Sequence, residues 1–443
     1  MRDQLNNVEV KQISHETLKP SIPTPYHRKS LTLSFIDQNI PHVHMPFLFI
    51  YTRYIDKTPS SDIITTLKKS LSDTLTQFYP LAGRCSDQNT VSCNDQGIPF
   101  IETCFECSLI HLLNSANKLD LMSKLLPPLD LFSFGQLPIF EVHPLVFQVN
   151  LFKCGGLVLG CYMLHKLLDA SSISTFLNYW AALASQQNED LVQPNFDITS
   201  TIFPQPQTPA TNDGDNSDSA GAALLWHRPS EIKVVAKSFT FDKIAINKLK
   251  VEATSVEVPN PTSFEVVAGF VWKNVMSDNG RSVLSFSGNI RARANPPLPR
   301  EAMGNLIVGA YSSVGQCDNF IDLVKEIHYE VLKLDQKVEN LKGINGLDFF
   351  LKYRECGPIS QGTTMYNLSS WCKLGLNRVD FGFGQPTKII PYGMVNPLLR
   401  NSIILVDYSD HNGDGIEVWL FLEESEMQNL ESNSKYLDFA SPS

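Results

Sequence analysis

The chain has 443 residues, of which 43% are hydrophobic and 19% charged, so it can bury one large core or two. The formal net charge of −10 excludes a broad nucleic-acid-binding surface, and a polyanionic ligand would need a local basic pocket. Nine scattered cysteines, an odd number, indicate reduced and packed thiols, not a disulfide framework.

Neither end of the chain carries a targeting signal that we can identify. The opening MRDQLNNVEV lacks the apolar core of a signal peptide, and the closing FASPS matches no retention or peroxisomal signal. No run of about 18 apolar residues predicts a membrane helix. We therefore expect a soluble, cytoplasmic protein that has no membrane partner.

Two short motifs resemble parts of metal-binding sites, but each lacks residues that such a site needs. Cys104 and Cys107 form a single C-x-x-C pair, whereas a zinc site needs a second pair or paired histidines. Asp213 opens a stretch similar to a calcium loop, but Asp218 and Leu224 stand where the loop needs glycine and glutamate. We expect no bound metal.

The first half reads as mixed α/β. Apolar residues recur with helical spacing over 61–78, where Ser61 is a plausible cap. The run LVLGCYML at 157–164 predicts a buried strand, and 172–184 predicts an amphipathic helix capped by Ser171 or Ser172. His165 therefore stands where a strand ends, with Asp169 in the turn before the helix, which is a common location for catalytic groups.

A composition change divides the chain near its middle. Over residues 200–222, proline and then Gly, Asp, Asn and Ser replace apolar residues, which predicts an exposed crossover linker. The chain is thereby divided into residues 1–199 and 223–443, each long enough for a domain.

The second half also reads as mixed α/β. Its expected elements, in chain order, are a strand at 236–242, helices at 242–253 and 262–276, a strand at 282–294, a helix at 319–335 and a hairpin over 401–424. The expected strand at 282–294 would carry Arg291 and Arg293 before a proline-rich turn. The hairpin would turn at the Asn-Gly-Asp-Gly sequence 412–415.

His165 admits two interpretations when it is taken alone. A single H-x-x-x-D motif is weak, because a match by chance in a chain with ten histidines is common. His165 could be a core histidine that donates to a nearby carbonyl, or the general base of a proton transfer. A serine-hydrolase triad is disfavoured because the sequence has no G-x-S-x-G motif. A protein kinase is disfavoured because the D-F-G sequence at 380–382 is not accompanied by the other kinase motifs.

An ordered set of motifs favours the general base. HKLLD at 165–169, NIRARANPPLPREAMGN at 289–305 and YNLSSWCKLGLNRVDFGFGQP at 366–386 follow one another at these separations. Together with FYPLAGR at 78–84 and the opening VEVKQISHETLKPSIPTP, they resemble the BAHD acyltransferases of plant specialised metabolism over nearly the whole chain. The DFGFG sequence at 380–384 is similar to the D-F-G-W-G box of that family.

The resemblance implies a mixed α/β, two-lobed fold like that of chloramphenicol acetyltransferase. The N-terminal lobe would span 1–199, joined by about 384–406, and the C-terminal lobe 223–443 would carry the DFGFG box. A solvent channel between the lobes would expose His165 to an acyl-CoA from one mouth and to an alcohol from the other. We expect a monomer, with acetyl-CoA as co-substrate and no permanently bound cofactor.

The resemblance also assigns roles to the H-x-x-x-D residues. His165 would be the base that takes the proton of the alcohol, and the alcohol would attack the thioester directly, without a covalent enzyme intermediate. Asp169 would point away from the reaction and anchor the loop by pairing with an arginine. Arg291 is the first candidate for that partner and Arg293 the second.

Further site residues follow from the resemblance. Asp380, Gly382 and Gly384 match the box, which would support the acyl-CoA side, while Phe383 replaces its tryptophan; inward packing of the box aromatics is the interpretation that we favour over direct contact. Beside the thioester, Ser369, Ser370 and Trp371 could supply an oxyanion donor, or the serines could simply face solvent from a strand. The candidate phosphate contacts are Ser263 and Lys273.

The identity of the acyl group and of the alcohol can be narrowed. A malonyl group would need a cation in a closed site, but the terminal strand offers Phe421 and its apolar neighbours. Residues 302–306 read AMGNL where malonyl-transferring members have Y-F-G-N-C, so we expect a small neutral acyl group, acetyl. The opening sequence most resembles members that acetylate plant alkaloids, which favours an indole alkaloid. Another acyl donor, an amine, terpenoid or simple alcohol acceptor, and a catalytically silent binding protein are the alternatives.

Overall fold

The computed structural model describes residues 9–52, 60–114, 118–133, 137–187, 191–205, 232–276, 281–315, 319–338, 363–391, 399–411 and 413–443. The chain forms two compact units. Unit 1 comprises Met1–Gln205, Pro299–Leu306 and Leu374–Met394, and unit 2 comprises the remaining segments Pro206–Leu298, Ile307–Lys373 and Val395–Ser443.

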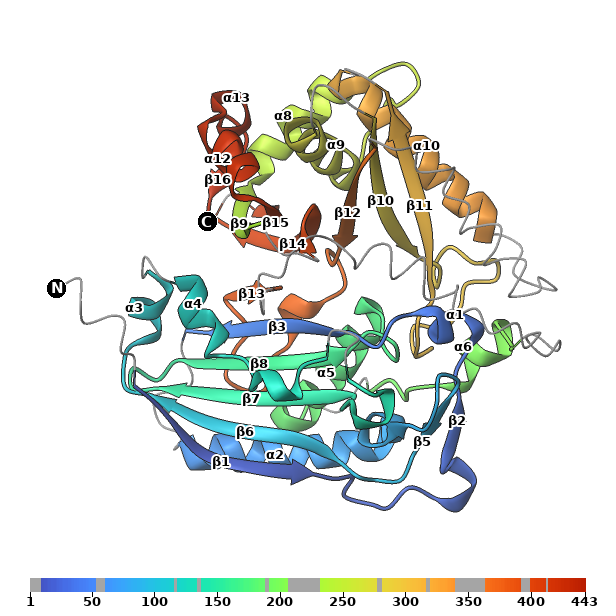
Figure 1. The fold of residues 1–443 in the computed structure, drawn as a ribbon, viewed down its shortest axis with the longest axis vertical. Helices are drawn as coiled ribbons and strands as arrows, with labels where there is room; N and C mark the ends of the chain where they lie inside the picture. The colour runs from blue at the N-terminus through green and yellow to red at the C-terminus, as the bar shows by residue number, and fades with distance from the viewer. Residues whose placement is uncertain are drawn as a thin grey trace. The chain divides into compact units, whose positions relative to one another are not determined.

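Unit 1 is built on a six-stranded mixed sheet (Figure 1). Its strands, in spatial order, are β1 (Val10–Leu18), β6 (Ile98–Phe105), β7 (Leu145–Phe152), β8 (Leu157–Leu164), β3 (His44–Tyr51) and β13 (Lys388–Ile390). Only β6 and β7 run parallel. Every residue of β7 and β8 is buried, which explains why these strands read as continuous apolar runs.

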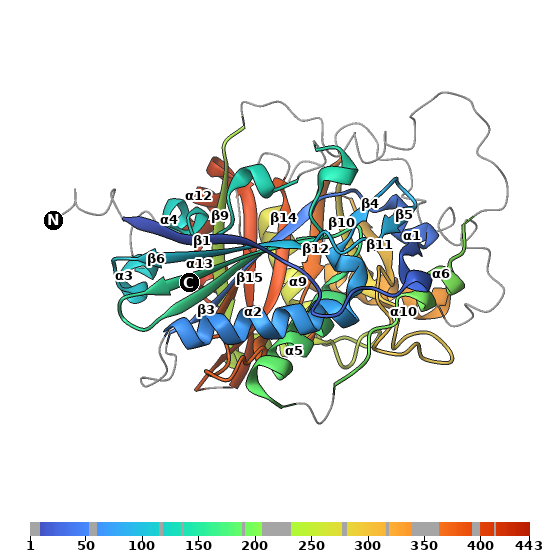
Figure 2. The ribbon, with the colours of Figure 1, turned by 90° about the horizontal axis from the view of Figure 1, so that it is seen from below.

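Two long helices lie side by side in unit 1, α2 (Ser60–Gln77) and α5 (Ala170–Ser185), as Figure 2 shows. The buried indole N–H of Trp180 on α5 donates to the carbonyl oxygen of Leu67 on α2 at 3.2 Å. The shorter elements are α1 (Phe35–Asn39), α3 (Leu109–Leu113), α4 (Lys118–Ser123), α6 (Asp197–Ile202), the strands β2 (Ser30–Thr32), β4 (Arg84–Cys85) and β5 (Thr90–Ser92), and 3-10 turns at Tyr26–Arg28, Tyr79–Ala82, Leu129–Leu131, Ile139–Glu141 and Leu376–Arg378.

Unit 2 has a seven-stranded mixed sheet in the order β11 (Ile307–Val314), β10 (Ser282–Asn289), β12 (Thr364–Ser370), β14 (Ser402–Asp410), β15 (Gly413–Glu423), β9 (Val234–Phe241) and β16 (Ser441–Pro442). β12 runs parallel to both of its neighbours. The helices of this unit are α8 (Lys243–Ala253), α9 (Ser263–Val275), α10 (Phe320–Val338), α12 (Glu424–Ser432) and α13 (Ser434–Leu437). In the described part of the chain, no helix is both long and apolar enough to span a bilayer.

The mixed α/β prediction for both halves is confirmed, as are the main elements around the site. The predicted strand 157–164 is β8, and the helices expected at 61–78, 172–184, 242–253, 262–276 and 319–335 correspond to α2, α5, α8, α9 and α10. Periodicity suffices for these elements because each buries one continuous apolar face.

Three local predictions are wrong. α5 is capped by Asp169, not by Ser171 or Ser172. The strand expected at 282–294 ends at Asn289, because the Asn289 side chain accepts a hydrogen bond from the backbone N–H of Arg291 at 3.0 Å and turns the chain. In the hairpin of β14 and β15, Gly413 already pairs with Asp410, so residues 413–415 belong to the strand and not to the predicted turn.

The position of the DFGFG box also differs from the prediction. We expected it in the C-terminal lobe, but Leu374–Met394 belongs to unit 1. Its aromatic content explains why, because Phe381 packs against Trp180 of α5 with ring centres 4.7 Å apart. Of the predicted linker 200–222, the first residues complete α6, and 206–222 lie outside the described residues.

A loop packs closely against the middle of β8. The Asn150 side chain on β7 donates to the carbonyl oxygen of Leu125 at 2.8 Å, and the Tyr162 hydroxyl on β8 donates to that of Pro127 at 2.9 Å. Gly160 lies between these contacts, and a Cβ atom there would be 2.0 Å from the Leu125 carbonyl oxygen. The glycine is therefore required by the close approach of backbone to backbone.

Gly160→Ala should destabilise the protein by about 1–3 kcal/mol or more, because neither the strand nor the loop can move away without breaking these bonds. Thermal unfolding measures this effect. Gly309→Ala on β11 is the matched control, since the atoms nearest to its Cβ would belong to the Tyr311 side chain, at 3.4 Å or more. Equal melting temperatures for the two variants would contradict the prediction.

Candidate functional site

His165 follows the last residue of β8. Its backbone N–H donates to the carbonyl oxygen of Val43 at 2.9 Å, which continues the pairing with β3 by one residue and holds the backbone in place. The residue is partly buried, and its Nδ1 atom is fully buried without a partner in normal hydrogen-bond geometry among the described residues. Burial lowers the pKa of the imidazole below its ordinary 6.5, against opposing effects from the His165 backbone, Asp169 and Asn305. Burial thus favours the neutral form of the ring.

Asp169 is a structural residue at the start of α5. One carboxylate oxygen, Oδ1, accepts the backbone N–H of Ser172 at 2.8 Å and so caps the helix. The other, Oδ2, accepts the backbone N–H of Leu306 at 3.0 Å. The residue is only 2% exposed. Both oxygens are thus directed at backbone groups that need acceptors.

The segment Pro299–Leu306, far along the sequence, completes the surroundings of His165 in unit 1. The Asn305 side-chain Nδ2 donates to the carbonyl oxygens of His165 at 2.9 Å and Lys166 at 3.2 Å. Ser172 donates its hydroxyl to the carbonyl oxygen of Gly304 at 2.9 Å. Gly304 has a φ of +108°, a conformation that glycine adopts without strain.

A buried acid supports Asn305 from the other side. The Asp37 Oδ1 atom accepts both the backbone N–H and the side-chain Nδ2 of Asn305, at 2.7 and 2.9 Å, while Oδ2 accepts the Ser34 hydroxyl at 2.6 Å. Burial raises the pKa of Asp37 to about 6, although these hydrogen bonds oppose the rise. The buried Lys166 ammonium donates to the Gln38 carbonyl oxygen at 2.8 Å, at the end of α1.

Sequence reasoning missed the roles of Asn305, Asp37 and Lys166. Asn305 lies within the quoted AMGNL stretch, but nothing in that stretch indicates which carbonyl groups it meets. The S-x-x-D spacing of Ser34 and Asp37 is a capping-box signal, which the structure forms at α1, and it was the available clue.

The DFGFG box forms a tight turn around Asp380. One carboxylate oxygen of Asp380 accepts the backbone N–H groups of Gly382 and Gly384, at 2.8 and 2.9 Å. Both glycines have positive φ, +98° and +101°, which explains why the motif needs glycine at these two positions.

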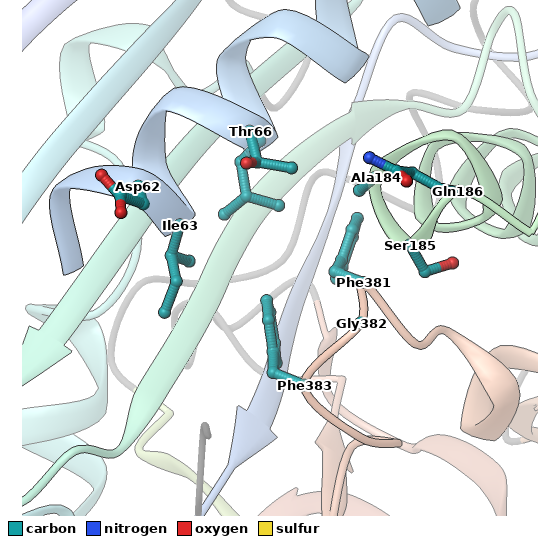
Figure 3. A pocket seen from close by; sticks show the side chains of 10 residues that line it. Asp62, Ile63, Thr66, Ala184, Ser185, Gln186, Phe381, Gly382 and Phe383 are labelled. Carbon is teal, nitrogen blue, oxygen red and sulfur yellow. The ribbon is translucent and has the colours of Figure 1, made fainter. Parts of the chain in front are cut away.

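The two aromatic residues of the box pack in unit 1. The Phe383 ring meets Tyr51 edge to face at 5.0 Å, and the Tyr51 hydroxyl donates to the carbonyl oxygen of Val379 at 2.9 Å. Phe381, Gly382 and Phe383 also line a cavity of about 230 Å³ together with α2 and the end of α5, shown in Figure 3. Phe381 and Phe383 point toward this cavity in Figure 3. These contacts match the packing interpretation of the box.

Ser369, Ser370 and Trp371 lie in unit 2, at and just beyond the end of β12. The Trp371 indole N–H donates to the Ser369 hydroxyl oxygen at 3.0 Å, and its backbone N–H donates to the Leu405 carbonyl oxygen at 2.8 Å. Both serines are half-buried. Because the Ser369 oxygen accepts the indole N–H of Trp371, the hydroxyl proton of Ser369 is left to donate to another acceptor.

The remaining predicted residues are dispersed over unit 2. Ser263 is the first residue of α9 and Lys273 lies in its last turn, which separates their backbones by about 15 Å along the helix. Phe421 on β15 is 1% exposed.

The two candidate arginines differ in their surroundings. Arg293 forms an ion pair with Asp335 of α10. Arg291 is buried, and its guanidinium donates to the Asn289 side chain at 3.2 Å. The pairing of Asp169 with an arginine, with Arg291 as the first choice, stays a prediction.

A family model described as the transferase family matches residues 8–437. The chain is 33% identical to stemmadenine O-acetyltransferase of Catharanthus roseus, over 95% of this chain and 96% of that protein. It is 31% identical to limonoid 7-O-acetyltransferase of Citrus sinensis, over 98% of each.

Vinorine synthase of Rauvolfia serpentina is similar in both sequence and structure. Its sequence is 33% identical over 95% of this chain and 96% of the relative. The crystal structure of vinorine synthase superposes with a TM-score of 0.80 and 29% identity, covering 98% of this chain and 99% of that one. The predicted fold like that of chloramphenicol acetyltransferase is thereby confirmed. The chain belongs to the transferase family of BAHD acyltransferases and is an O-acetyltransferase.

Proposed function

We propose that the enzyme transfers an acetyl group from acetyl-CoA to a hydroxyl group of a plant alkaloid, with His165 as the general base. The observation that carries the proposal is the state of His165, a partly buried imidazole at the end of β8 whose pKa is lowered by burial. A neutral imidazole can accept a proton near neutral pH, whereas an imidazolium cannot.

The reaction needs one base and one oxyanion site. As the alcohol oxygen attacks the thioester carbonyl, His165 takes the hydroxyl proton and a tetrahedral oxyanion forms. Collapse of that intermediate forms the ester and breaks the carbon–sulfur bond, and the imidazolium returns its proton to the leaving thiolate of CoA. Ser369 is our candidate donor to the oxyanion, because the Trp371 indole N–H occupies its acceptor side.

Asp169 does not act as a proton relay in this proposal. Its two oxygens accept backbone N–H groups of Ser172 and Leu306. Its charge raises the pKa of His165 and so opposes the effect of burial. We further propose that Arg291 neutralises this carboxylate. Such a buried pair would fix the geometry of the loop, because breaking it leaves an uncompensated charge.

We propose acetyl as the acyl group because no cation lies among the apolar residues 418–422 of β15. Phe421 remains our candidate for acyl selectivity. Since Phe421 is 1% exposed, a Phe421→Arg variant would bury a charge, so donor choice is better tested on the unmodified enzyme.

The proposed acceptor alcohol is supported only by sequence similarity to other acetyltransferases. Stemmadenine O-acetyltransferase and vinorine synthase are 33% identical to this chain, and we propose an indole alkaloid alcohol on that basis. A terpenoid alcohol is the second candidate, because a limonoid 7-O-acetyltransferase is 31% identical. The odd, scattered cysteines support action in a reducing, cytoplasmic compartment.

Release of free CoA thiol tests the substrates directly. With acetyl-CoA as donor, we expect thiol release to rise with indole alkaloid alcohols and not with limonoid alcohols, and malonyl-CoA to react at least tenfold more slowly (about 1.4 kcal/mol). Product mass should increase by one acetyl group. Thiol release only in the presence of a limonoid alcohol would replace the alkaloid proposal. No thiol release with either class of alcohol would contradict O-acetyl transfer to alcohols of both classes.

His165→Ala and Asp169→Ala should fail in different ways. Loss of the base should lower kcat by about 10²- to 10⁴-fold with an unchanged melting temperature. Asp169→Ala removes a helix cap, which costs about 0.5–2 kcal/mol, and leaves the buried Leu306 N–H without its acceptor, which costs about 1–3 kcal/mol. The melting temperature and kcat should therefore fall together in that variant.

Asp169→Asn is the matched control, because asparagine keeps one acceptor oxygen for the helix cap. It should recover part of the stability that Asp169→Ala loses. A fully stable Asp169→Ala enzyme with a purely chemical defect would refute the structural role that we assign.

The pH dependence follows from the lowered pKa of His165. Only the neutral imidazole is active, so kcat/KM should rise with pH and reach half of its plateau below pH 6.5. Asp169→Asn should move this midpoint to lower pH, since the carboxylate favours the imidazolium. Asp37 titrates near pH 6, so the midpoint should also be measured in Asp37→Asn, where it should persist. A midpoint above 6.5 would contradict the assignment.

A further inference from the structure

The Asn305 side chain has an orientation that its neighbours determine. Its Nδ2 atom faces three acceptors, the Asp37 carboxylate and the carbonyl oxygens of His165 and Lys166, at 2.9, 2.9 and 3.2 Å. A flipped amide would place its oxygen against these three oxygens and lose every bond. The Oδ1 atom therefore points to the opposite side.

Two buried polar atoms beside each other in the hydrogen-bond network lack an ordinary partner. They are Asn305 Oδ1 and His165 Nδ1, both without solvent contact or a normal hydrogen bond among the described residues. Asn305 itself is fully buried. A buried amide oxygen needs a donor, and a ring nitrogen can be one if it carries the proton. The two atoms are thus complementary in only one tautomer of the imidazole.

The surroundings of the ring favour the same tautomer. The Asn305 side chain and the backbone of His165 both raise the pKa of the imidazole, against the effect of burial, and so favour a proton on the ring. Asn305 also holds that carbonyl group in place through Nδ2. Asn305 therefore acts on the imidazole itself and also holds the backbone carbonyl group of the same residue.

We propose that Asn305 is the positioning residue of the general base: its Oδ1 accepts the Nδ1–H of His165, which leaves the lone pair on Nε2 for the alcohol. The inference rests on the proposed function of His165 and extends it. Asn305 touches no reacting atom, and it acts only through the tautomer and orientation of the ring.

Asp37 strengthens this arrangement electrostatically. Its Oδ1 accepts both N–H donors of Asn305, and Ser34 holds its second oxygen. A carboxylate on the amide N–H side polarises the amide, so Oδ1 becomes a better acceptor. Ser34, Asp37, Asn305 and His165 form one chain of hydrogen-bonding groups that ends at the base.

The decisive measurement is the tautomer of His165. In protein labelled with ¹⁵N-histidine, protonated and unprotonated ring nitrogens give widely separated signals, and the His165 signals are those missing from His165→Gln. At pH 7.5 we expect the proton on Nδ1 in the unmodified enzyme. Asn305→Leu, of similar size but without polar groups, should show a mixture of tautomers and a kcat about 10- to 100-fold lower, with KM for acetyl-CoA little changed.

A charge-swapped pair separates positioning from mere stability. Asp37→Asn combined with Asn305→Asp keeps one carboxylate and one amide, but places the carboxylate against Nδ1. The half-plateau pH of kcat/KM should then move upward relative to the unmodified enzyme, because a carboxylate stabilises the imidazolium more than an amide does. A residue with only a structural role would not move this midpoint.

Ser34→Ala is the control, since it removes the 2.6 Å bond to Asp37 and leaves Asn305 and His165 intact. It should lower the melting temperature without changing the tautomer. The inference is overturned if Asn305→Leu retains the Nδ1 proton, or keeps kcat within twofold of the unmodified enzyme. A fully active His165→Gln would instead overturn the proposed base, while the tautomer measurement would still decide the role of Asn305.

Discussion

The site depends on the hydrogen bonds that join the H-x-x-x-D loop to residues 305 and 306. Asn305 donates to the His165 carbonyl oxygen across 140 positions of sequence, and Leu306 donates to Asp169 across 137. Closing so long a loop costs conformational entropy that only buried contacts can offset. Strand β8 and helix α5 can therefore form locally, but the base acquires its final geometry only when Pro299–Leu306 has returned to unit 1.

The groups around these hydrogen bonds are polar and buried, so they favour one arrangement of the loop over others. Asp37, Lys166 and Asn305 are each at most 3% exposed. A different packing of the loop would leave a carboxylate, an ammonium group or an amide without its partners, at a cost of about 1–3 kcal/mol or more for each. These residues thus act against alternative arrangements of the loop more than they add to the stability of the native one.

The sequence predicted those parts of the fold that rest on local patterns. Runs of apolar residues identified β8 and α5, and the order of the motifs identified the family. It failed where a distant partner decides the structure: Asp169 rather than a serine caps α5, because Leu306 holds its second oxygen in place. The placement of the DFGFG box in unit 1 depends on Tyr51 and Trp180, whose proximity no spacing in the sequence reveals.

The spacing of four residues between His165 and Asp169 has a physical reason in this structure. Backbone N–H groups of Leu167 and Leu168 donate to the carbonyl oxygens of Leu164 and His165, so the chain makes one tight turn from the strand to the helix cap. Asp169 is thereby close enough to raise the pKa of His165, yet both of its oxygens accept backbone N–H groups. Burial alone would weaken the base, and a direct carboxylate contact would keep it protonated. The turn places a negative charge near the imidazole while both carboxylate oxygens serve backbone N–H groups.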